Sequence, residues 1–408
     1  MSQAVTVMPT AGPLTMAAYS ADVNAALAAI VSQNSGTTAP SATAPGFGQF
    51  WLDTSTTPRT LRIYDGAQWV AVGTLDTAGH LWATVGASGG LTGFRNRLIN
   101  GAFAVDQRNA GAAQTIAAGA ALAYTVDRLW AACTGASVTG QRIAGTMGTP
   151  YAYRFTGAAS VTGIQIGERI EAINCWDLAG TSATLSVDLA NSLLTTVTWT
   201  AYYATTTDTF GSLASPTKTL IATGSFTVNA TVSRYTTNIS IPSAATTGIE
   251  VVLSVGAQSS GTWTIGRIQL EPGATATSFE FRPIGTETEL CQRYFQTSYE
   301  YGTVPGTATL TGSVTFRVPT IADAFAFVGF WTLTPQMRGS PTVISYSPNT
   351  GTAGKAYNNV NGDFNVQIIA GPIQSSKILG WQGANASGAS SAGTVTQNYV
   401  HFTASAEL

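Results

Sequence analysis

The sequence has little charge. Only 9% of its 408 residues are Asp, Glu, Lys or Arg, against about 25% in an ordinary soluble protein. Lysine occurs only at Lys218, Lys355 and Lys377, and the formal net charge is −2. No basic run is present, which argues against a nucleic-acid partner or an anionic membrane surface. No apolar stretch is long enough to span a bilayer, so we also expect no membrane insertion.

Metal-binding and redox residues are equally scarce. His80 and His401 are the only histidines, which argues against a histidine-based metal site within one chain. Cys133, Cys175 and Cys291 are odd in number and follow no metal-binding spacing, so we expect buried free thiols. The first residues lack the basic and apolar regions of a secretory signal. We therefore expect folding in a reducing cytoplasm, with no metal and no other cofactor.

Catalytic patterns are few. Residues 86–90 match G-x-S-x-G, the pattern of a nucleophile elbow that carries a catalytic serine. The match is in letters alone, because the strand-turn-helix pattern that such an elbow needs is absent around these residues. The catalytic arrangement that the sequence argues against least is a pair of carboxylates, as in glycan hydrolases. The candidate pairs are Glu168 with Glu171 and Glu287 with Glu289. Their sequence context favours solvated or helix-capping roles instead. The sequence thus predicts a protein that is not an enzyme.

What is abundant favours β-structure. Thr, Ser, Ala and Gly replace the usual charged residues, and these suit pleated strands and tight turns. Nine tryptophans argue against disorder. Over residues 96–285 apolar residues alternate with polar ones, as in Leu185, Val187 and Leu189, which predicts half-buried strands of an antiparallel sandwich. The alternation slips at Gly266-Arg267, where we predict a β-bulge.

The N-terminal part of the chain shows different sequence patterns. Residues 1–36 contain the one long helical candidate, a heptad stripe that suits an attachment or oligomerising helix; the stripe consists of Met16, Tyr19, Val23, Ala26 and Ile30. Residues 37–95 predict a linker and a small β-hairpin region with a two-residue turn at Asp65-Gly66. This region has too few apolar residues for a good core, which favours association with copies of itself.

The C-terminal part, residues 286–408, predicts a short helix followed by a β-domain. Thr286 and Glu289 have the spacing of a capping box. Leu290, Cys291, Tyr294 and Phe295 would then share one helical face. Strands are expected at four places beyond the helix, namely residues 314–318, 343–346, 364–369 and 399–404. Mainly β-structure, with a short N-terminal helix, is therefore the predicted fold class.

Several motifs occur together in a particular order. The first is FGQFWLDTS at residues 47–55, continuing to GTLD at residues 73–76. The second is NRLINGAF at residues 96–103, with DQRN at 106–109 and YTVDR at 124–128. This second module closes on the segment from Thr262 to Pro283, followed by ELCQRYF at residues 289–295. The third is in the C-terminal domain, with GTAGK at residues 351–355 and the ending HFTASAEL at residues 401–408. Together they resemble phage and prophage tail-fibre proteins that carry a carbohydrate-binding-module-like jelly-roll domain. In that family a tryptophan usually follows Asp-Arg directly, whereas Leu129 intervenes before Trp130 here.

This resemblance implies a structural virion protein of a bacteriophage, assembled in the host cytoplasm. It implies a homotrimer that joins other tail or baseplate proteins through its N-terminal region and attaches to a host surface polysaccharide. Residues 96–285 would form the jelly-roll, and residues 286–408 the host-contacting tip. Asn100, Asp127 and Arg128 would be structural, and Glu271 would accept backbone donors at a strand end rather than ligate a cation.

Aromatic side chains are the candidates for glycan binding, because they stack on the apolar faces of sugars. Tyr202 interrupts the alternation of its strand, and four others lie near Gly-, Asn- and Ser-rich segments of the C-terminal domain. The predicted glycan-binding residues are Tyr202, Trp331, Tyr346, Tyr357 and Trp381.

Two alternatives remain open at this point. One is a purely architectural virion protein, such as a head fibre, a decoration protein or a baseplate adaptor, which would not bind host cells. The other is a glycan depolymerase, whose carboxylates would meet at an interface between subunits. Binding to host cells and the release of new reducing ends would separate these alternatives from a receptor-binding fibre.

Overall fold

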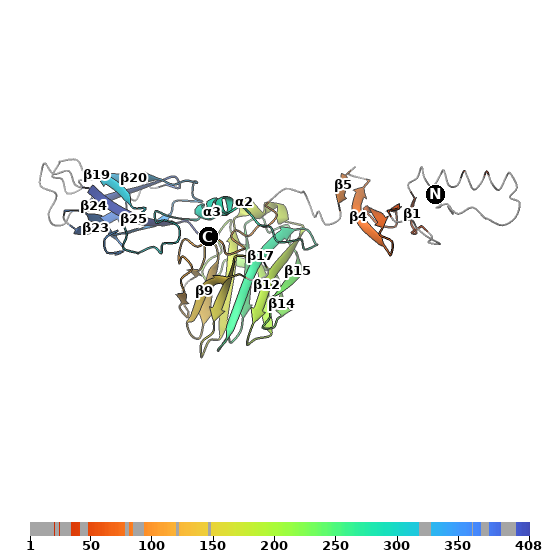
Figure 1. Cartoon of the computed structure of the whole chain (residues 1–408), viewed down its shortest axis with the longest axis horizontal. Coiled ribbons are helices and arrows are strands. Elements are labelled where there is room, and N and C mark those ends of the chain that lie inside the picture. Colours follow the sequence, from red (N-terminus) through yellow and green to blue (C-terminus); the bar gives the residue numbers. More distant parts are fainter. Residues whose placement is uncertain are drawn as a thin grey trace. The chain divides into compact units, whose positions relative to one another are not determined.

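The computed structural model describes a mainly β protein, which confirms the predicted fold class (Figure 1). It describes residues 34–40, 48–77, 81–84, 94–119, 122–145, 148–317, 328–360, 362–368, 375–384 and 397–408, together with Ser20 and Asn24. The chain divides into two compact units, Met1–Thr92 and Gly93–Leu408. The helix predicted within residues 1–36 falls almost entirely outside the described residues. Among those residues, no helix is long and apolar enough to cross a membrane.

The first unit holds one five-stranded sheet in the order β1-β2-β3-β4-β5. Its strands are β1 (Ser35–Gly36), β2 (Phe50–Asp53), β3 (Arg59–Tyr64), β4 (Trp69–Asp76) and β5 (Leu81–Thr84). β1 pairs with β2 in parallel, and the other pairs are antiparallel. The β3–β4 pair confirms the hairpin predicted here.

The turn of this hairpin differs from the prediction. Residues 65–68 connect the two strands, instead of a two-residue turn at Asp65-Gly66. The reason is the Asp65 carboxylate, which accepts the amide protons of Ala67 at 2.8 Å and Gln68 at 2.7 Å. A side chain that satisfies two loop amides stabilises a wider turn than the backbone alone would form.

The sheet of the first unit buries little. Among the described residues of this unit, Trp51 is the only hydrophobic side chain that is buried. Its ring meets that of Trp69 edge-on, with 5.6 Å between the centroids. Phe50 and Val70 lie on the opposite face and are exposed. The described part of this unit thus has the poor core that its composition predicts.

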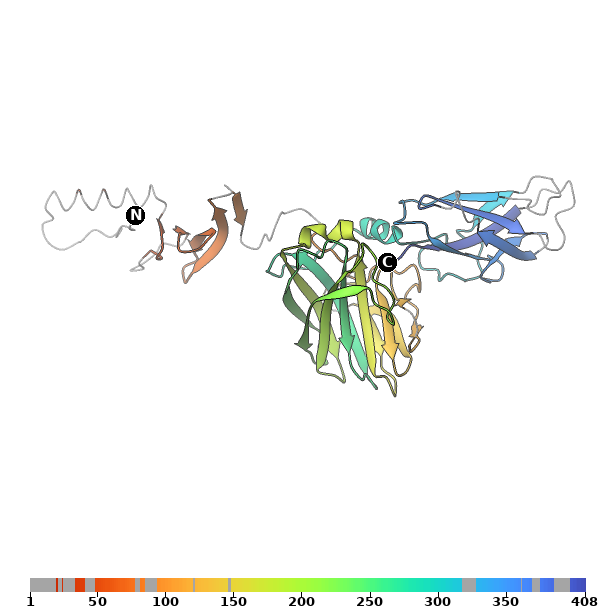
Figure 2. The ribbon, with the colours of Figure 1, turned by 180° about the vertical axis from the view of Figure 1, so that it is seen from behind.

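The second unit begins with two six-stranded sheets that pack face to face as an antiparallel jelly-roll sandwich (Figures 1 and 2). One sheet has the order β15-β12-β17-β10-β9-β6, and the other β14-β13-β16-β11-β8-β7. The strands are β6 (Gln114–Ile116), β7 (Ala123–Tyr124), β8 (Trp130–Thr134), β9 (Val138–Ala144), β10 (Tyr151–Thr156), β11 (Gly163–Ile170), β12 (Ser182–Asn191), β13 (Thr196–Ala204), β14 (Lys218–Thr227), β15 (Ser233–Ser240), β16 (Ile249–Val255) and β17 (Thr262–Pro272).

One hydrophobic core fills the space between these sheets, and the predicted alternation identifies the side chains that enter it. Leu189 of β12 and Leu253 of β16 are both buried there. The prediction of a half-buried strand is nevertheless wrong for β12, because Ser186 and Asp188 on its other face are buried as well. Asp188 forms an ion pair with Arg267 on the neighbouring strand, so its charge is compensated without contact with water.

The predicted β-bulge is confirmed. Ser186 of β12 pairs with Gln269, whereas Asp188 pairs with Gly266, so two residues of β17 oppose one residue of β12. Arg267 at this point has a φ of +39°. The bulge turns the Arg267 side chain to the face that carries Asp188, and it reverses the parity of the apolar residues along β17.

Three short helical segments lie at one end of the sandwich (Figure 2). They are α2 (Ala172–Cys175), η1 (Trp176–Leu178) and α3 (Ile284–Gln292). α3 is the predicted short helix, but the predicted capping box of Thr286 and Glu289 is wrong. The N-cap is Pro283, and no side chain caps the helix. Glu287 of the first turn is buried instead and accepts the amide proton of Asn100, far away in the sequence.

The rest of the second unit is an eight-stranded sheet in the order β18-β25-β22-β23-β24-β20, in which β19 and β21 also pair with β25. Its strands are β18 (Phe295–Thr297), β19 (Val314–Arg317), β20 (Val328–Thr332), β21 (Thr342–Tyr346), β22 (Lys355–Asn358), β23 (Gly362–Ile368), β24 (Ile378–Ala384) and β25 (Gln397–Ser405). All four strand regions predicted here are present. A second core, with Val400 and Phe402 of β25 at its centre, supports this sheet.

Candidate functional site

Motif residues that are far apart in the sequence meet at one end of the sandwich. Asn100 has a φ of +63°, a conformation that Asn tolerates better than most residues. Its Nδ2 donates to the main-chain oxygens of Val105 at 2.7 Å and Asp127 at 2.9 Å. A Cβ atom on Gly101 would collide with the main-chain oxygen of Ile268. The Asn-Gly pair therefore has a structural role, in agreement with the prediction.

Asp127 and Arg128 are also structural. The Asp127 carboxylate accepts the backbone amide of Gln107 at 2.7 Å, and burial raises its pKa to about 7. The buried Arg128 guanidinium stacks on the Tyr294 ring, 3.5 Å from the centroid, and forms an ion pair with Glu407. The Asp-Arg motif thus connects the sandwich to the residues that follow α3 and to the C-terminal segment.

Arginine side chains bind the last residues of the sequence. Glu407 also pairs with Arg108, with 2.7 Å between Nη2 and Oε1. Arg169 donates to the main-chain oxygen of Leu408 at 2.7 Å, and Arg338 donates to that of Ala406 at 2.9 Å. These contacts use charged groups to hold β25 against the sandwich end.

The carboxylates considered for catalysis are engaged in structural contacts. Glu168, Glu171 and Glu287 are buried, so their expected solvated or capping roles are wrong. Glu168 accepts a backbone amide at 2.8 Å, and burial raises its pKa to about 8. Glu171 accepts from Arg293 at 2.8 Å. Only Glu289 remains exposed, on the outer side of α3.

Glu271 has the role predicted for it. Its Oε1 accepts the backbone amide of Thr277 at 2.9 Å and Nε2 of Gln269 at 3.0 Å. All three cysteines are free and buried, as predicted. Among the described residues, no group of three or more His, Cys, Asp or Glu side chains is placed to hold a metal ion.

A serine–histidine pair that the sequence did not reveal lies in the C-terminal sheet. The Ser298 hydroxyl is 2.9 Å from Nδ1 of His401, and Nε2 of His401 is 3.0 Å from the Thr309 carbonyl oxygen. The Tyr299 ring stacks on the histidine at 3.8 Å, and burial lowers the histidine pKa. A carbonyl in place of a carboxylate, together with the full burial of the imidazole, gives this pair a structural role.

Four of the five aromatic residues predicted to bind glycan belong to the C-terminal sheet, and Tyr202 belongs to the sandwich. Trp331 on β20 and Trp381 on β24 are two residues apart in register on paired strands, whereas Tyr346 on β21 and Tyr357 on β22 lie on strands that both pair with β25. Trp331 is 39% exposed, whereas Tyr346 and Tyr357 are half-buried. Trp381 belongs to β24, but its side chain lies outside the described part of the structure. Tyr202 on β13 is half-buried, and Lys218 Nζ lies 4.2 Å from its ring centroid.

The tryptophan that departs from the family motif occupies the outer face of its sheet. Leu129 enters the main core, and Trp130 packs with Ala132 and Val252 on the other side. Tyr202 covers part of this second cluster. The protein's own side chains thus cover much of the outer face of this sheet around β8 and β16.

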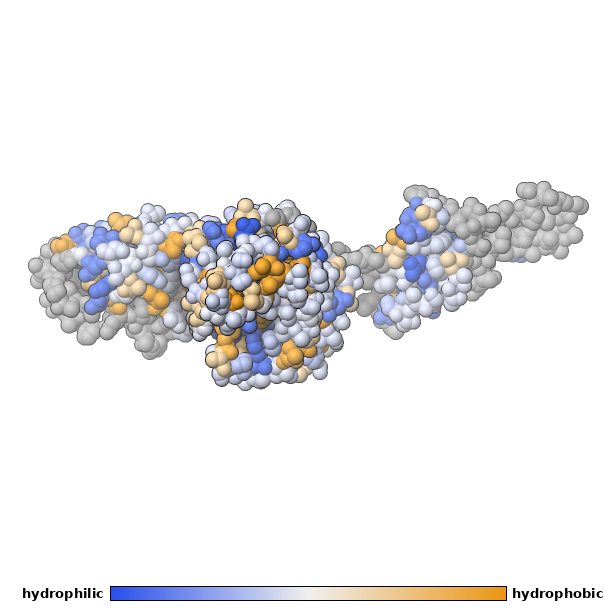
Figure 3. All heavy atoms as spheres, turned by 90° about the horizontal axis from the view of Figure 1, so that it is seen from below, coloured by the Kyte–Doolittle hydropathy of each residue, from blue (hydrophilic) through white to orange (hydrophobic). Residues whose placement is uncertain are grey.

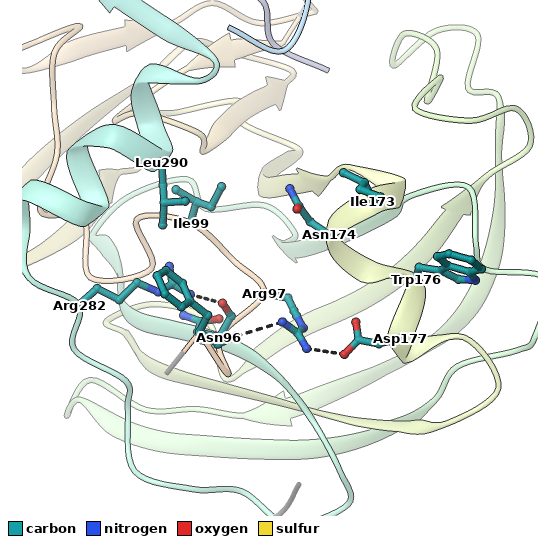
Figure 4. A pocket seen from close by; sticks show the side chains of 10 residues that line it. Asn96, Arg97, Ile99, Ile173, Asn174, Trp176, Asp177, Arg282 and Leu290 are labelled. Carbon is teal, nitrogen blue, oxygen red and sulfur yellow. Dashed lines mark hydrogen bonds and ion pairs between the residues drawn. The ribbon is translucent and has the colours of Figure 1, made fainter. Parts of the chain in front are cut away.

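An open groove lies instead at the helical end of the sandwich. It encloses a cavity of about 530 Å³, within the range of roughly 300–1,000 Å³ typical of ligand pockets. Three segments line it: residues 94–99, the α2–η1 turn, and the chain from Arg282 to Leu290 of α3 (Figure 4). Apolar patches and polar surface alternate over the sandwich seen from below in Figure 3.

The α2–η1 turn supplies the apolar side of the groove. Cys175 and Leu178 point inward and are buried, so the residues at the complementary helical positions point outward. Ile173 is 72% exposed and Trp176 is 67% exposed. Two neighbouring large apolar side chains this exposed are a feature of binding surfaces. Asn174 lies between them in the sequence and lines the same cavity.

The facing side of the groove is polar and rigid. Arg97 forms an ion pair with Asp177, and Figure 4 shows this pair between Asn96 and Trp176. Asn96 accepts the amide protons of Leu98 at 3.1 Å and Leu270 at 3.0 Å through its side-chain oxygen. These bonds fix the segment that carries Arg97. The groove therefore combines an exposed indole with preorganised polar groups.

Sequence reasoning missed this groove. Trp176 follows a strand in a stretch with no long amphipathic pattern, so it resembled any other core tryptophan. The motif around Asn96 marked one wall, but nothing in the sequence showed that the α2–η1 turn would face it. The available signal was the spacing of Ile173 and Trp176, which lie three residues apart and out of phase with Cys175 and Leu178, the buried side chains of the same turn.

Comparisons with known proteins give matches of fold only. No protein-family model matches the sequence, and no curated protein matches it either. Among solved structures, a family 4 carbohydrate-binding module matches at 15% identity and a TM-score of 0.28, over 43% of this chain and 98% of that chain. A family 61 module in complex with β-1,4-galactotriose matches at 12% identity and a TM-score of 0.28, over 44% and 99%. The enzymatically active domain of bacteriophage CBA120 tailspike protein 4 matches at 13% identity and a TM-score of 0.26, over 45% of this chain and 22% of that chain.

Proposed function

We propose that this chain is a non-enzymatic structural protein of a bacteriophage particle, a tail-fibre or receptor-binding component that attaches to a host surface glycan. The observation that carries the binding role is the groove in which the exposed Trp176 lies beside Asn174 and the Arg97–Asp177 pair. Sugars present apolar faces to aromatic rings and hydroxyls to fixed polar groups, and this groove offers both kinds of contact.

The phage assignment rests on the ordered sequence motifs. Their residues meet in one network: Asn100, Asp127 and Arg128 connect to Glu287 and Tyr294. A network of this kind gives a physical reason for the motifs to occur together and in order. In this proposal the protein is part of the virion, assembled in the host cytoplasm, and it joins other tail or baseplate proteins through its N-terminal region.

Homotrimerisation is part of the same proposal. The sheet of the first unit buries one hydrophobic side chain among its described residues, so association of copies would supply the core that it lacks. Three linked sites would also raise the avidity for a weakly bound glycan. Mass photometry of the full chain is expected to show a trimer, and a stable monomer would contradict this part.

The binding role is tested with the full chain and the variant Trp176→Ala. The exposed indole makes little contribution to folding, so the variant should fold normally by circular dichroism. Retention on gels cast with bacterial capsular or O-antigen polysaccharides, and labelling of whole cells, should weaken by about tenfold or more, equivalent to about 1.4 kcal/mol of lost stacking.

Trp331→Ala tests the rival site, because Trp331 is an exposed tryptophan outside the groove that the sequence predicts to bind glycan. Loss of binding in Trp331→Ala but not in Trp176→Ala would move the site to the predicted C-terminal residues. An intact chain that labels no host cell would favour the architectural alternative. New reducing ends after incubation with the retained polysaccharide would favour the depolymerase.

A further inference from the structure

A second pocket lies next to the groove. It encloses about 340 Å³ and is lined by Tyr151, Phe281, Ile284 and Tyr301, among others. Phe281 is 58% exposed and Tyr301 is 60% exposed. The Tyr301 hydroxyl donates to the main-chain oxygen of Ala104 at 2.9 Å, which fixes the orientation of its ring. This pocket therefore repeats the chemistry of the first, with aromatic rings held in place beside polar groups.

The two pockets share a wall. Asn96 and Arg282 line both of them. Arg282 is held rigidly, since its guanidinium donates to the main-chain oxygens of Asn96 and of Leu98, the latter at 3.3 Å. Its carbon lies 5.4 Å from the centre of the Phe94 ring, which lines the first pocket. The shared wall places the two pockets in immediate succession along the sandwich end.

All the charges around the two pockets are paired. Arg97 is bonded to Asp177 in the first pocket. Arg282 is paired with Glu280 at 3.4 Å and with Glu287 at 3.3 Å. Among the described residues, these are all the charged side chains that line either pocket. An acidic sugar would have to displace a carboxylate from one of these arginines, whereas an uncharged sugar would leave the pairs intact.

Donors without an acceptor are present in the same walls. Nε of Arg97 and Nε of Arg282 are buried and have no hydrogen-bond partner among the described residues. The Arg282 side chain is 6% exposed. A buried donor that lacks an acceptor is costly, by roughly 1–3 kcal/mol. Both Nε atoms are closed off from solvent, so a ligand in the pockets would meet the Nη atoms of these arginines, which are already bonded to carboxylate or main-chain oxygens.

From these contacts we propose that the two pockets are successive subsites for one uncharged oligosaccharide segment. One end of the segment stacks at Trp176, its middle crosses Asn96 and Arg282, and its other end meets Phe281 and Tyr301. This inference rests on the proposed glycan-binding function and adds two points, namely that the glycan is neutral and that it extends over both pockets.

The inference that the glycan is uncharged is tested by affinity electrophoresis of the full chain. Gels contain neutral polysaccharides (dextran, galactomannan and mixed-linkage β-glucan) or uronate polysaccharides (alginate and polygalacturonate), together with neutral and acidic bacterial capsules. Retention by at least one neutral polymer, unchanged by added salt, is expected. Retention by uronate polymers alone, abolished by salt, would overturn the neutral assignment and leave glycan binding intact. Retention by none of the gels would contradict both.

The length part is tested with Tyr301→Ala, Trp176→Ala and the control Phe330→Ala, which removes a comparably exposed ring elsewhere. Short and long fragments of the retained neutral polymer are titrated by calorimetry. Tyr301→Ala should weaken long fragments by about tenfold, equivalent to about 1.4 kcal/mol, and leave short ones unchanged. Trp176→Ala should weaken both.

The two-subsite inference is overturned if Tyr301→Ala binds fragments of every length as tightly as the unmodified chain while Trp176→Ala still binds them weakly. In that case the proposed function stands. An unaffected Trp176→Ala variant would remove the proposed site itself. Circular dichroism of each variant establishes that its fold is retained, and Tyr301→Phe, which keeps the ring, should restore the affinity for long fragments.

Discussion

The jelly-roll sandwich and the five-stranded sheet of the first unit are built from similar strands but are stabilised differently. In the sandwich, the faces of β12 that point into and away from the core are both buried, and Asp188 on the outer side is neutralised by arginine. In the sheet, Phe50 is 48% exposed, and Trp51 rests on one neighbouring ring. Alternation of apolar residues is thus enough to form a strand, but a second layer of structure is needed to make it a core.

The largest expected difference comes from removing one tryptophan from each region. Trp263→Ala takes away a fully buried indole that stacks on Phe155 at 5.4 Å. We expect it to lower the free energy of unfolding of the second unit by about 3–5 kcal/mol. Trp51→Ala should cost the first unit less than half as much, because its ring has fewer neighbours.

Urea unfolding followed by circular dichroism measures both losses. The unmodified chain provides the reference transitions, and Trp331→Ala serves as a control for removing a more exposed indole. Equal losses for Trp263→Ala and Trp51→Ala would show that the first unit has a core as complete as that of the sandwich, and would remove the basis of the comparison.

A somewhat smaller effect is expected from the buried ion pairs. Glu407→Ala leaves the buried Arg128 without this carboxylate partner, although Glu168 remains 3.9 Å away. Breaking a buried pair from one side costs about 3–5 kcal/mol, and we expect the lower part of that range. Arg62→Ala in the first unit removes a more exposed partner of Asp53 and should cost about 1 kcal/mol or less. Chemical denaturation of the two variants gives the ratio, and a loss under about 1 kcal/mol for Glu407→Ala would contradict the anchoring role.

The smallest expected effect is a difference in pH dependence. Burial raises the pKa of Asp127 to about 7. A carboxyl with a raised pKa in the folded state contributes stability that is complete below its unfolded pKa and is lost as the pH rises through the folded value. Asp127 alone should therefore cost the second unit roughly 2–3 kcal/mol between pH 5 and pH 8, because the slope is about 1.4 kcal/mol per pH unit until the folded pKa is reached. Asp127→Asn should reduce that slope without abolishing it, because burial also raises the pKa of Glu168 in the same unit, to about 8.

The first unit should respond in the opposite direction. Burial acts to raise the pKa of Asp53, but hydrogen bonds from Ser55 and Arg62 outweigh it and hold the pKa below its ordinary value. Its contribution is present above the unfolded pKa and is lost as the pH falls. Thermal unfolding of the full chain at several pH values tests this contrast. A parallel response of both units, or an Asp127→Asn variant with the original slope, would count against it.

Local patterns predicted the strands, the bulge at Arg267 and a short helix after Pro283, because each depends on the spacing of neighbouring residues. The predicted helical face extended too far, since α3 ends at Gln292 and Phe295 begins β18. The patterns failed where a distant partner intervened. Thr286 was a reasonable cap, but the first turn of α3 is organised by contacts of Glu287 with Asn100. Glu168 had the surroundings of a solvated residue, yet the fold placed it beside a backbone amide in the interior.

The sequence by itself determined that this is a β-protein with little charge, few histidines and a recurrent set of motifs, since composition and alternation act through local geometry. It did not determine where a ligand would bind. Trp176 became a candidate because the α2–η1 turn buries Cys175 and Leu178 and leaves the indole exposed at the edge of a pocket that Arg97, from another segment, also lines. That arrangement depends on packing between residues about eighty positions apart in the chain, as the Arg97–Asp177 bond illustrates, and only the folded structure brings them together.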